Sequence, residues 1–279
     1  MRMLKQLFDF YINASIHVAS SVLALTWVSF IRLEIPCDFS VLLFNFFATI
    51  TGYNFVKYFG LAKFHHRSLT NWLKAVQLFS FICFFALVYF AFKLEAVTWC
   101  YILVLATITF LYAIPFLPRN IFVDSKQNLR EIGGLKIYII ALVWSVATVL
   151  LPVVENGVLF SADVFIMMLQ RFVFVLVLML PFEIRDLSYD SLKLSTLPQK
   201  IGIYKTKAIG VCLLGMFLFL EFFKDTMNYN AVFILAVVVF ITMLFIVFSK
   251  ENQRKYYSSF WVEGLPILWL ALLLLYGTA

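Results

Sequence analysis

Apolar residues occur along the chain in long runs that short polar stretches separate. An α-helix needs about 20 apolar residues to cross a hydrocarbon core of about 30 Å. Nine runs of about that length lie near residues 11–31, 39–61, 73–94, 97–117, 132–152, 164–182, 203–223, 230–249 and 260–277. We find no short apolar signal segment with a small-residue cleavage site before them and expect the first run to be retained. The pattern predicts an all-α integral membrane protein with nine transmembrane helices.

Composition supports a multi-pass membrane protein. Hydrophobic residues make up 63% of the 279 positions and charged residues only 13%, whereas soluble domains carry about 25% charged residues. We see no low-complexity linker or separate soluble segment. We therefore treat residues 1–279 as a single polytopic membrane domain, in which helices one to four and five to eight could form two similar halves.

Lys and Arg residues predict the orientation of the chain. Arg32, Lys93 and Lys224 lie in the connections on one side, Arg171 lies within the sixth run, and the other basic residues lie in the alternate connections. The positive-inside rule then places the N-terminus in the cytoplasm and the C-terminus outside, in a cell (inner) membrane. The net charge of +7 is thus a topology signal. We expect no nucleic-acid partner, because no basic soluble segment is present to bind one.

Three carboxylates mark the cytoplasmic end of the sixth run. Glu183, Asp186 and Asp190 are spaced three and four residues apart, so they share one face of a helix. Ionisable groups at membrane depth usually face a cavity or a partner. Oxygen ligands suit Mg²⁺, which binds one or two carboxylates together with substrate phosphates. The alternative is that these carboxylates only solvate a helix end beside Arg185 and Lys193.

The surrounding residues "RDLSYDSLKLSTLPQKIG" resemble the second aspartate motif of the UbiA family of intramembrane prenyltransferases. The matching positions are Arg185, Asp186, Asp190, Thr196, Leu197, Pro198 and Gly202. The stretch "LYAIPFLPR" is similar to the family's sequence at the end of helix four, with Tyr112, Pro115 and Arg119 as the matching positions. The likeness covers the whole chain in topology but only about 25 residues in motifs.

This resemblance implies a nine-helix UbiA-like bundle with a polar site at its cytoplasmic face. Members of the family hold a prenyl diphosphate through Mg²⁺ between two aspartate motifs, on helices two and six. They ionise it to an allylic cation and attach the prenyl group to an acceptor. The implied partners are therefore a prenyl diphosphate, a lipid-soluble or aromatic acceptor and membrane lipids.

The first aspartate motif is missing from this chain. Residues 39–94 contain no Asp or Glu; Asn54 can stand for the family's asparagine, and Lys57 falls where an aspartate is expected. One account is a remodelled site, because lysine is an effective point-charge ligand for phosphate. Metal ligands would then be Glu183, Asp186 and Asp190. The expected diphosphate ligands are Asn54, Lys57, Lys63, Arg67, Tyr112, Arg119, Arg185 and Lys193. We assign no catalytic residue.

Two other functions compete with the enzyme. The motif could have decayed, leaving a non-catalytic lipid-binding or structural membrane subunit with a possible protein partner. A transporter is the third choice, for which Arg171 and Glu263 inside apolar runs would be suited. The clustering of charges at one membrane face speaks against it, because transporter sites lie near the midplane. We expect Arg171 to reach the interface or pair with another helix. Among the carboxylates outside the motif, Glu263 is the best candidate to face the cavity.

Overall fold

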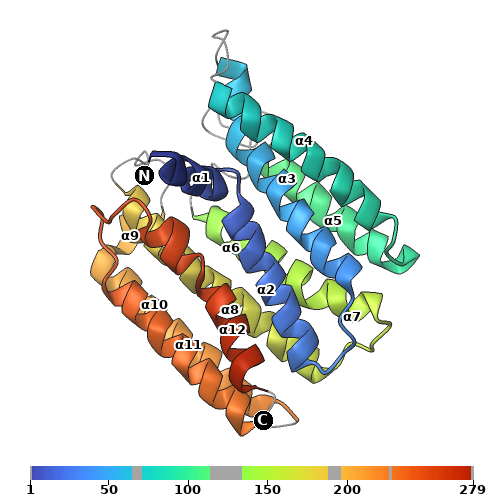
Figure 1. Ribbon diagram of the computed structural model, residues 1–279. Coiled ribbons are helices and arrows are strands. Elements are labelled where there is room, and N and C mark those ends of the chain that lie inside the picture. Colours follow the sequence, from blue (N-terminus) through green and yellow to red (C-terminus); the bar gives the residue numbers. More distant parts are fainter. Residues whose placement is uncertain (1, 65–70, 114–133, 188–195, 226–227, 278–279) are drawn as a thin grey trace, which may run out of the picture.

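The computed structural model describes residues 2–64, 71–113, 134–187, 196–225 and 228–277. Every regular element within these ranges is a helix (Figure 1). The bounds are α1 Arg2–Asn13, α2 Ile16–Arg32, α3 Phe39–Phe64, α4 Asn71–Ala91, α5 Ala96–Ala113, α6 Leu135–Ser145, η3 Val146–Leu150, α7 Leu151–Glu155, α8 Ala162–Asp186, α9 Leu197–Ile201, α10 Ile203–Phe219, η5 Leu220–Phe223, α11 Tyr229–Val247, η6 Tyr257–Val262 and α12 Leu265–Tyr276.

The predicted all-helical membrane class is confirmed. Seven helices or continuous helical segments in the described ranges are long and apolar enough to cross a membrane, or eight if the bent pair α1–α2 is one span. The run expected at 97–117 is a shorter apolar helix, Ala96–Tyr112, at the edge of a described range. The count of nine spans therefore stays a prediction.

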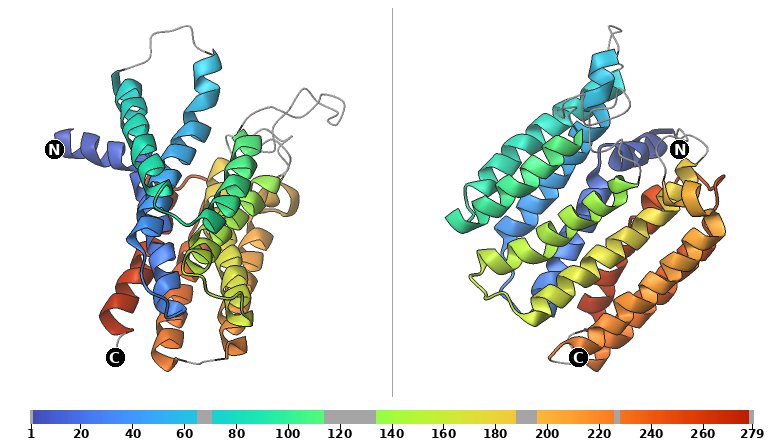
Figure 2. Two further views of the ribbon diagram at one scale, coloured as in Figure 1. Left: turned by 90° about the vertical axis from the view of Figure 1, so that its right-hand side faces the viewer. Right: turned by 180° about the vertical axis from the view of Figure 1, so that it is seen from behind.

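The first predicted run differs from the structure at its start. The helix expected from residue 11 is broken between Asn13 and Ile16, where α1 and α2 meet at a bend of 54°. Ser15 produces the break, because it adopts the left-handed conformation with φ at 63°, which an α-helix cannot contain. Helix α1 consequently lies across one end of the bundle instead of continuing α2 (Figure 2).

Helix α8 lies in the centre of one part of the bundle. It packs against α6 and α10, while α2 packs against α3 and α12. Buried apolar residues of α2, α6, α8, α11 and α12 form the largest core cluster. Within it, the ring of Phe174 lies 5.2 Å from that of Phe217 and 5.4 Å from that of Trp269. This packing fixes the position of the C-terminal end of α8, which carries the predicted motif.

The last part of that motif builds a short helix. The backbone N–H of Thr196 donates to the Gln199 side chain at 3.0 Å, which caps the start of α9, and Pro198 lies in its first turn. Gly202 ends the helix with φ at 81°, a conformation that favours glycine. These contacts give Thr196, Pro198 and Gly202 a structural reason to be present.

The described ends of the chain lie at opposite ends of the bundle (Figure 2). Helix α1 is at one end, and α12 finishes at the other. The assignment of these ends to the cytoplasmic and outer sides stays a prediction.

Candidate functional site

A large cavity opens at the α1 end of the bundle. Its volume is about 1120 Å³, and its walls come from α1, α3, α4, α5, α6, α8 and η6. Toward the other end, residues such as Phe44, Leu87 and Trp99 make the walls apolar. The described charged residues of the wall are Asp9, Lys57, Lys136, Glu183, Arg185, Asp186, Lys255 and Glu263. The cavity therefore has a charged mouth and an apolar interior.

Two of the predicted metal ligands lie together in this mouth. Glu183 and Asp186 are on the last turns of α8, and both line the cavity. The Lys136 ammonium, from the first turn of α6, lies 3.2 Å from Glu183 Oε1 and 4.0 Å from Asp186 Oδ2. Lys136 thus stands between the two carboxylates. Sequence analysis interpreted it only as a topology signal.

Arg185 also contributes to the mouth. Its Nε donates to Asp186 Oδ1 at 2.7 Å, and its guanidinium lies 5.2 Å from the ring centre of Phe182. Both residues line the cavity. The Asp186 carboxylate therefore faces two cations, Arg185 and Lys136.

Lys57 reaches the cavity from α3 and is anchored at the helix bend. Its ammonium donates to the Ser15 hydroxyl at 2.8 Å, and Ser15 donates to Asn54 Oδ1 at 2.8 Å. The Asn54 amide nitrogen in turn donates to the Ala14 carbonyl and to Ser80 Oγ. Lys57 keeps two of its three ammonium protons for other partners.

Asn54 and Lys57 therefore differ in their surroundings, although the sequence placed both in the diphosphate site. Asn54 is buried and holds the α1–α2 bend against α3 and α4, and it is not among the residues that line the cavity. Lys57 is exposed to the cavity. A direct contact of either residue with a diphosphate stays a prediction.

Glu263, the candidate among the carboxylates outside the motif, lies on the cavity wall. It follows η6, and its carboxylate attracts both Lys57 and Arg185 electrostatically. Its backbone carbonyl accepts a hydrogen bond from Ser21, which fixes this segment to α2. Glu263 therefore brings a carboxyl group from the C-terminal part of the chain to the site.

Aromatic side chains line the wall next to the charged mouth. Trp144 Nε1 donates to the Tyr53 hydroxyl at 3.1 Å. Tyr112, from the second matching motif, is buried and lines the same cavity. The structure thus brings Tyr112, Lys57 and Asp186 to one opening, from three different helices.

Helix α1 covers part of the mouth. Asp9 accepts from Lys255 Nζ at 2.5 Å and from the Tyr256 hydroxyl at 2.8 Å. The ring of Phe8 lies 5.0 Å from that of Tyr256. The hydrogen bond to Asp9 raises the pKa of Lys255, so this contact remains an ion pair at neutral pH. These contacts fix α1 to the segment before η6.

The remaining predicted ligands fall outside the described residues or side chains. Asp190, Arg67, Arg119 and Lys193 lie in segments that are not described, and the described side chains of α3 end at Tyr58, before Lys63. Their placement stays a prediction.

The described carboxylates could hold one Mg²⁺. Within the described ranges there is no group of three or more Asp, Glu, His or Cys side chains arranged for a metal. Glu183 and Asp186 supply two oxygen donors on one helical face, which meets the needs of an ion that also binds phosphates and water. Lys136 would have to move aside. The binding of Mg²⁺ stays a prediction.

Arg171 does pair with other helices, as expected, but far from this cavity. Its Nη2 donates to Ser29 Oγ on α2 at 3.1 Å, and its guanidinium lies 5.2 Å from the ring centre of Trp269 on α12. The structure also shows that charges are buried at both ends of the bundle. This weakens the argument that a one-sided charge distribution excludes a transporter.

Comparison with known proteins shows a likeness in fold to one solved structure. No protein-family model matches the sequence, and a search of curated proteins found no significant match. One solved structure, of a digeranylgeranylglyceryl phosphate synthase in membranes, aligns with a TM-score of 0.56 over 99% of this chain and 97% of that one, at 15% sequence identity. The chain therefore shares its overall fold with a membrane-embedded synthase.

Proposed function

We propose that this protein is a UbiA-like prenyltransferase homologue that binds a prenyl diphosphate in the large cavity and transfers the prenyl group to a lipid-soluble or aromatic acceptor. One observation carries the proposal. Asp186 of the matching motif, Lys57 at the position of the missing aspartate and Tyr112 of the second motif line the same cavity. The shared fold with a synthase whose product carries geranylgeranyl groups supports prenyl transfer at a coarse level.

The shape of the cavity suits a molecule with a charged head and a long apolar tail. Its volume of about 1120 Å³ exceeds the roughly 300–1,000 Å³ typical of small-molecule sites, which leaves room for a long ligand. A diphosphate would lie at the charged mouth, and the prenyl chain would extend along the apolar walls. Burial of that chain contributes about 0.8 kcal/mol for each CH₂ group removed from water.

The cations at the mouth would bind the diphosphate. Lys57, Lys136 and Arg185 come from three helices, so a diphosphate between them would be held from several directions. Such preorganised charges stabilise the negative charge that develops on a leaving diphosphate. Mg²⁺ held by Glu183 and Asp186, when bound, would supply further neutralisation of that charge.

The proposed reaction breaks the bond between prenyl C1 and the diphosphate oxygen. The electron pair leaves with the diphosphate, and the allylic cation remains in the cavity. A nucleophilic atom of the acceptor then bonds to C1 and releases a proton. The faces of Tyr53 and Trp144 would stabilise the cation and exclude water, because aromatic rings attract cations.

A non-catalytic lipid-binding role remains the second candidate for a specific reason. Each described carboxylate of the mouth already has a cation nearby: Lys136 for Glu183, Arg185 for Asp186, Lys57 for Glu263 and Lys255 for Asp9. A mouth that is neutralised in this way could hold an anionic lipid headgroup without ionising it.

Two measurements on the purified protein separate these functions. Isothermal titration with geranylgeranyl diphosphate, with and without Mg²⁺, measures binding. Release of diphosphate in the presence of a lipid extract measures ionisation and transfer. Binding with release supports the enzyme, and binding without release supports the lipid-binding role. The absence of binding under both conditions would exclude the proposed function.

A further inference from the structure

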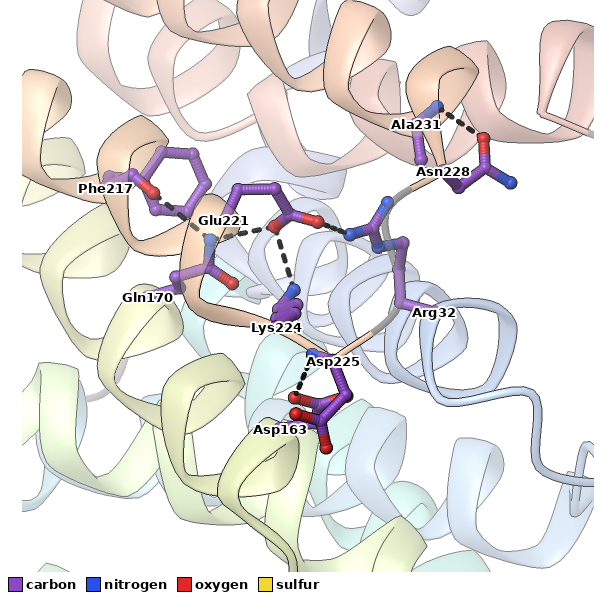
Figure 3. Close-up of polar contacts among 9 residues, drawn as sticks. All are labelled: Arg32, Asp163, Gln170, Phe217, Glu221, Lys224, Asp225, Asn228 and Ala231. Atoms are coloured by element: carbon purple, nitrogen blue, oxygen red, sulfur yellow. Dashed lines mark hydrogen bonds and ion pairs between the residues drawn. The ribbon is translucent and has the colours of Figure 1, made fainter.

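A second charged cluster is buried at the other end of the bundle from the large cavity. It consists of Arg32 at the end of α2, Gln170 and Arg171 on α8, Glu221 in η5 and Lys224 just after it. Figure 3 shows Arg32, Gln170 and Lys224 directed at Glu221. Arg171 is 1% exposed and Glu221 is 2% exposed. The proposed prenyl transfer uses none of these residues.

The carboxylate of Glu221 is fully occupied by its neighbours. One oxygen accepts from Arg32. The other accepts from Lys224 Nζ at 2.8 Å and from Gln170 Nε2 at 2.9 Å. The single negative charge of Glu221 is therefore shared between Arg32 and Lys224, and it does not also compensate a third cation.

Arg171 is that third cation. It lies nine residues after the start of α8, roughly 14 Å along the helix, and therefore inside a membrane span. Its Nη2 donates to Ser29, but its buried Nη1 has no hydrogen-bond partner in the described part of the chain. No described carboxylate lies within 4 Å of its guanidinium. The Trp269 ring contact attracts the charge but does not neutralise it.

A small cavity lies among these groups. Its volume is about 10 Å³, and its polar lining consists of Arg32, Gln170, Arg171, Glu221 and Lys224. Three cations and one carboxylate thus surround a space of about the size that one water molecule needs. Asp163 attracts Lys224 from outside the lining but is also bonded to the Asp225 backbone N–H. The lining therefore carries an excess of positive charge.

We propose that this small cavity is a binding site for a single chloride ion. Uncompensated charge at membrane depth is costly, and a monovalent anion would offset the excess. The free Nη1 of Arg171 and the remaining ammonium protons of Lys224 would donate to it. Polyatomic anions such as phosphate are too large for the space. A bound water would satisfy Nη1 but would leave the charge uncompensated.

Bromide replaces chloride in such sites and can be located directly. Crystals of the protein grown in sodium bromide should show an anomalous peak between Arg171 and Lys224. In detergent, the unfolding temperature should rise with chloride when gluconate keeps the ionic strength constant, because a ligand of the folded state stabilises it. Above the dissociation constant the rise should follow the logarithm of the chloride concentration. Electrostatic screening stays the same along such a series, because the ionic strength is constant.

Two variants and one control test the assignment. Arg171→Gln and Lys224→Gln should each raise the chloride dissociation constant obtained from this series by about tenfold or more, the loss expected for one hydrogen bond to a charged group. Lys93→Gln removes a cation that lies over the rings of Tyr89 and Phe90, outside the cluster, and it should leave the chloride curve unchanged. If the variants fail to fold, the presence or absence of the bromide peak in the unmodified protein still tests the chloride site. The proposal is overturned by a water without anomalous signal at the site, or by a chloride curve that all three variants share.

Discussion

The ammonium of Lys57 donates to the hydroxyl of Ser15 at 2.8 Å, so a residue of the cavity mouth is joined to the bend between α1 and α2. Ser15 has a left-handed backbone and is fully buried. This relationship gives Lys57 a structural contact as well as a proposed ligand role. A test of the ligand role must therefore separate the two.

A matched pair of variants separates them. Lys57→Ala should weaken the binding of geranylgeranyl diphosphate by about tenfold to a hundredfold, because one charge-assisted hydrogen bond contributes about 1.5–3 kcal/mol. Ser15→Gly removes the hydroxyl partner but keeps the backbone conformation, which glycine adopts readily. It should retain the affinity. Isothermal titration measures both, and equal losses in the two variants would show that Lys57 acts only through the bend.

Substitutions of Lys136 and of Asp186, its partner in the cavity mouth, should change the Mg²⁺ dependence of diphosphate binding in opposite directions. Asp186→Asn removes a proposed ligand and should abolish the Mg²⁺ dependence of diphosphate binding. Lys136→Gln removes the ammonium between Glu183 and Asp186. It should increase that dependence, because Glu183 loses the cation 3.2 Å from it and Asp186 loses one of its two neighbouring cations. Titrations at several Mg²⁺ concentrations check this, with the exposed Lys250→Gln as control. An unchanged Mg²⁺ response in both variants contradicts the metal assignment.

The predicted orientation can be tested by thiol labelling. The parent for this test carries alanine at Cys37, Cys83, Cys100 and Cys212, of which all but Cys83 are exposed. A cysteine at Ser125 or Ser191 should react with a reagent supplied from the cytoplasm, whereas one at Asn156 or Asn228 should not. Cytoplasmic labelling at Asn156 would show that the nine-span topology is wrong.

Glu221 should be critical for stability. Glu221→Gln leaves Arg32 and Lys224 without their carboxylate, and breaking a buried ion pair in this way costs about 3–5 kcal/mol. The free energy of unfolding in detergent measures the loss. The exposed Glu251→Gln should change it by less than about 0.5 kcal/mol. A similar small effect at both positions would contradict the buried network.

Two glycines of α10 provide a test of helix packing. A Cβ on Gly210 would lie 2.9 Å from Leu180 Cδ1 and 3.3 Å from Ile246 Cγ2, whereas one on Gly215 would meet nothing within 4 Å. Gly210→Ala should therefore destabilise the protein by about 1–3 kcal/mol through overpacking. Gly215→Ala should stabilise it by about 0.5–1 kcal/mol, because alanine favours the helix. The unfolding temperatures of the two variants, compared side by side, report the difference, and the reverse order would contradict the packing of α8 against α10.

The long apolar runs predicted most of the fold because each helix must satisfy its own backbone within the membrane. The break at Ser15 was not predictable in this way, since hydropathy is averaged over many residues and a single left-handed residue leaves it unchanged. Glu263 could be singled out as a candidate for the cavity, because a carboxylate at membrane depth usually faces a cavity or a partner. These successes depend on local properties of the chain.

Pairings between distant residues could not be derived from the sequence. Lys136 and Glu183 are separated by two spans and the connection between them. Nothing in the local surroundings of Lys136 distinguishes it from the other lysines of that side. Asn54 is the reverse case. It matches the asparagine of a family motif, which suggested a ligand of the diphosphate, but in the structure its side chain holds the helix bend. Only the packing of the helices separates these roles.

The contact between Arg32 and Glu221 also has a consequence for the synthesis and membrane insertion of the protein. The two residues are 189 positions apart, so a ribosome that adds about 5–20 residues per second makes Arg32 roughly 10–40 s before its partner. During that interval the end of α2 carries a cation whose partner Glu221 has not yet been made. We therefore expect α2 to hold Arg32 at the lipid headgroups, and the bundle to close around it only after α10 has entered the membrane.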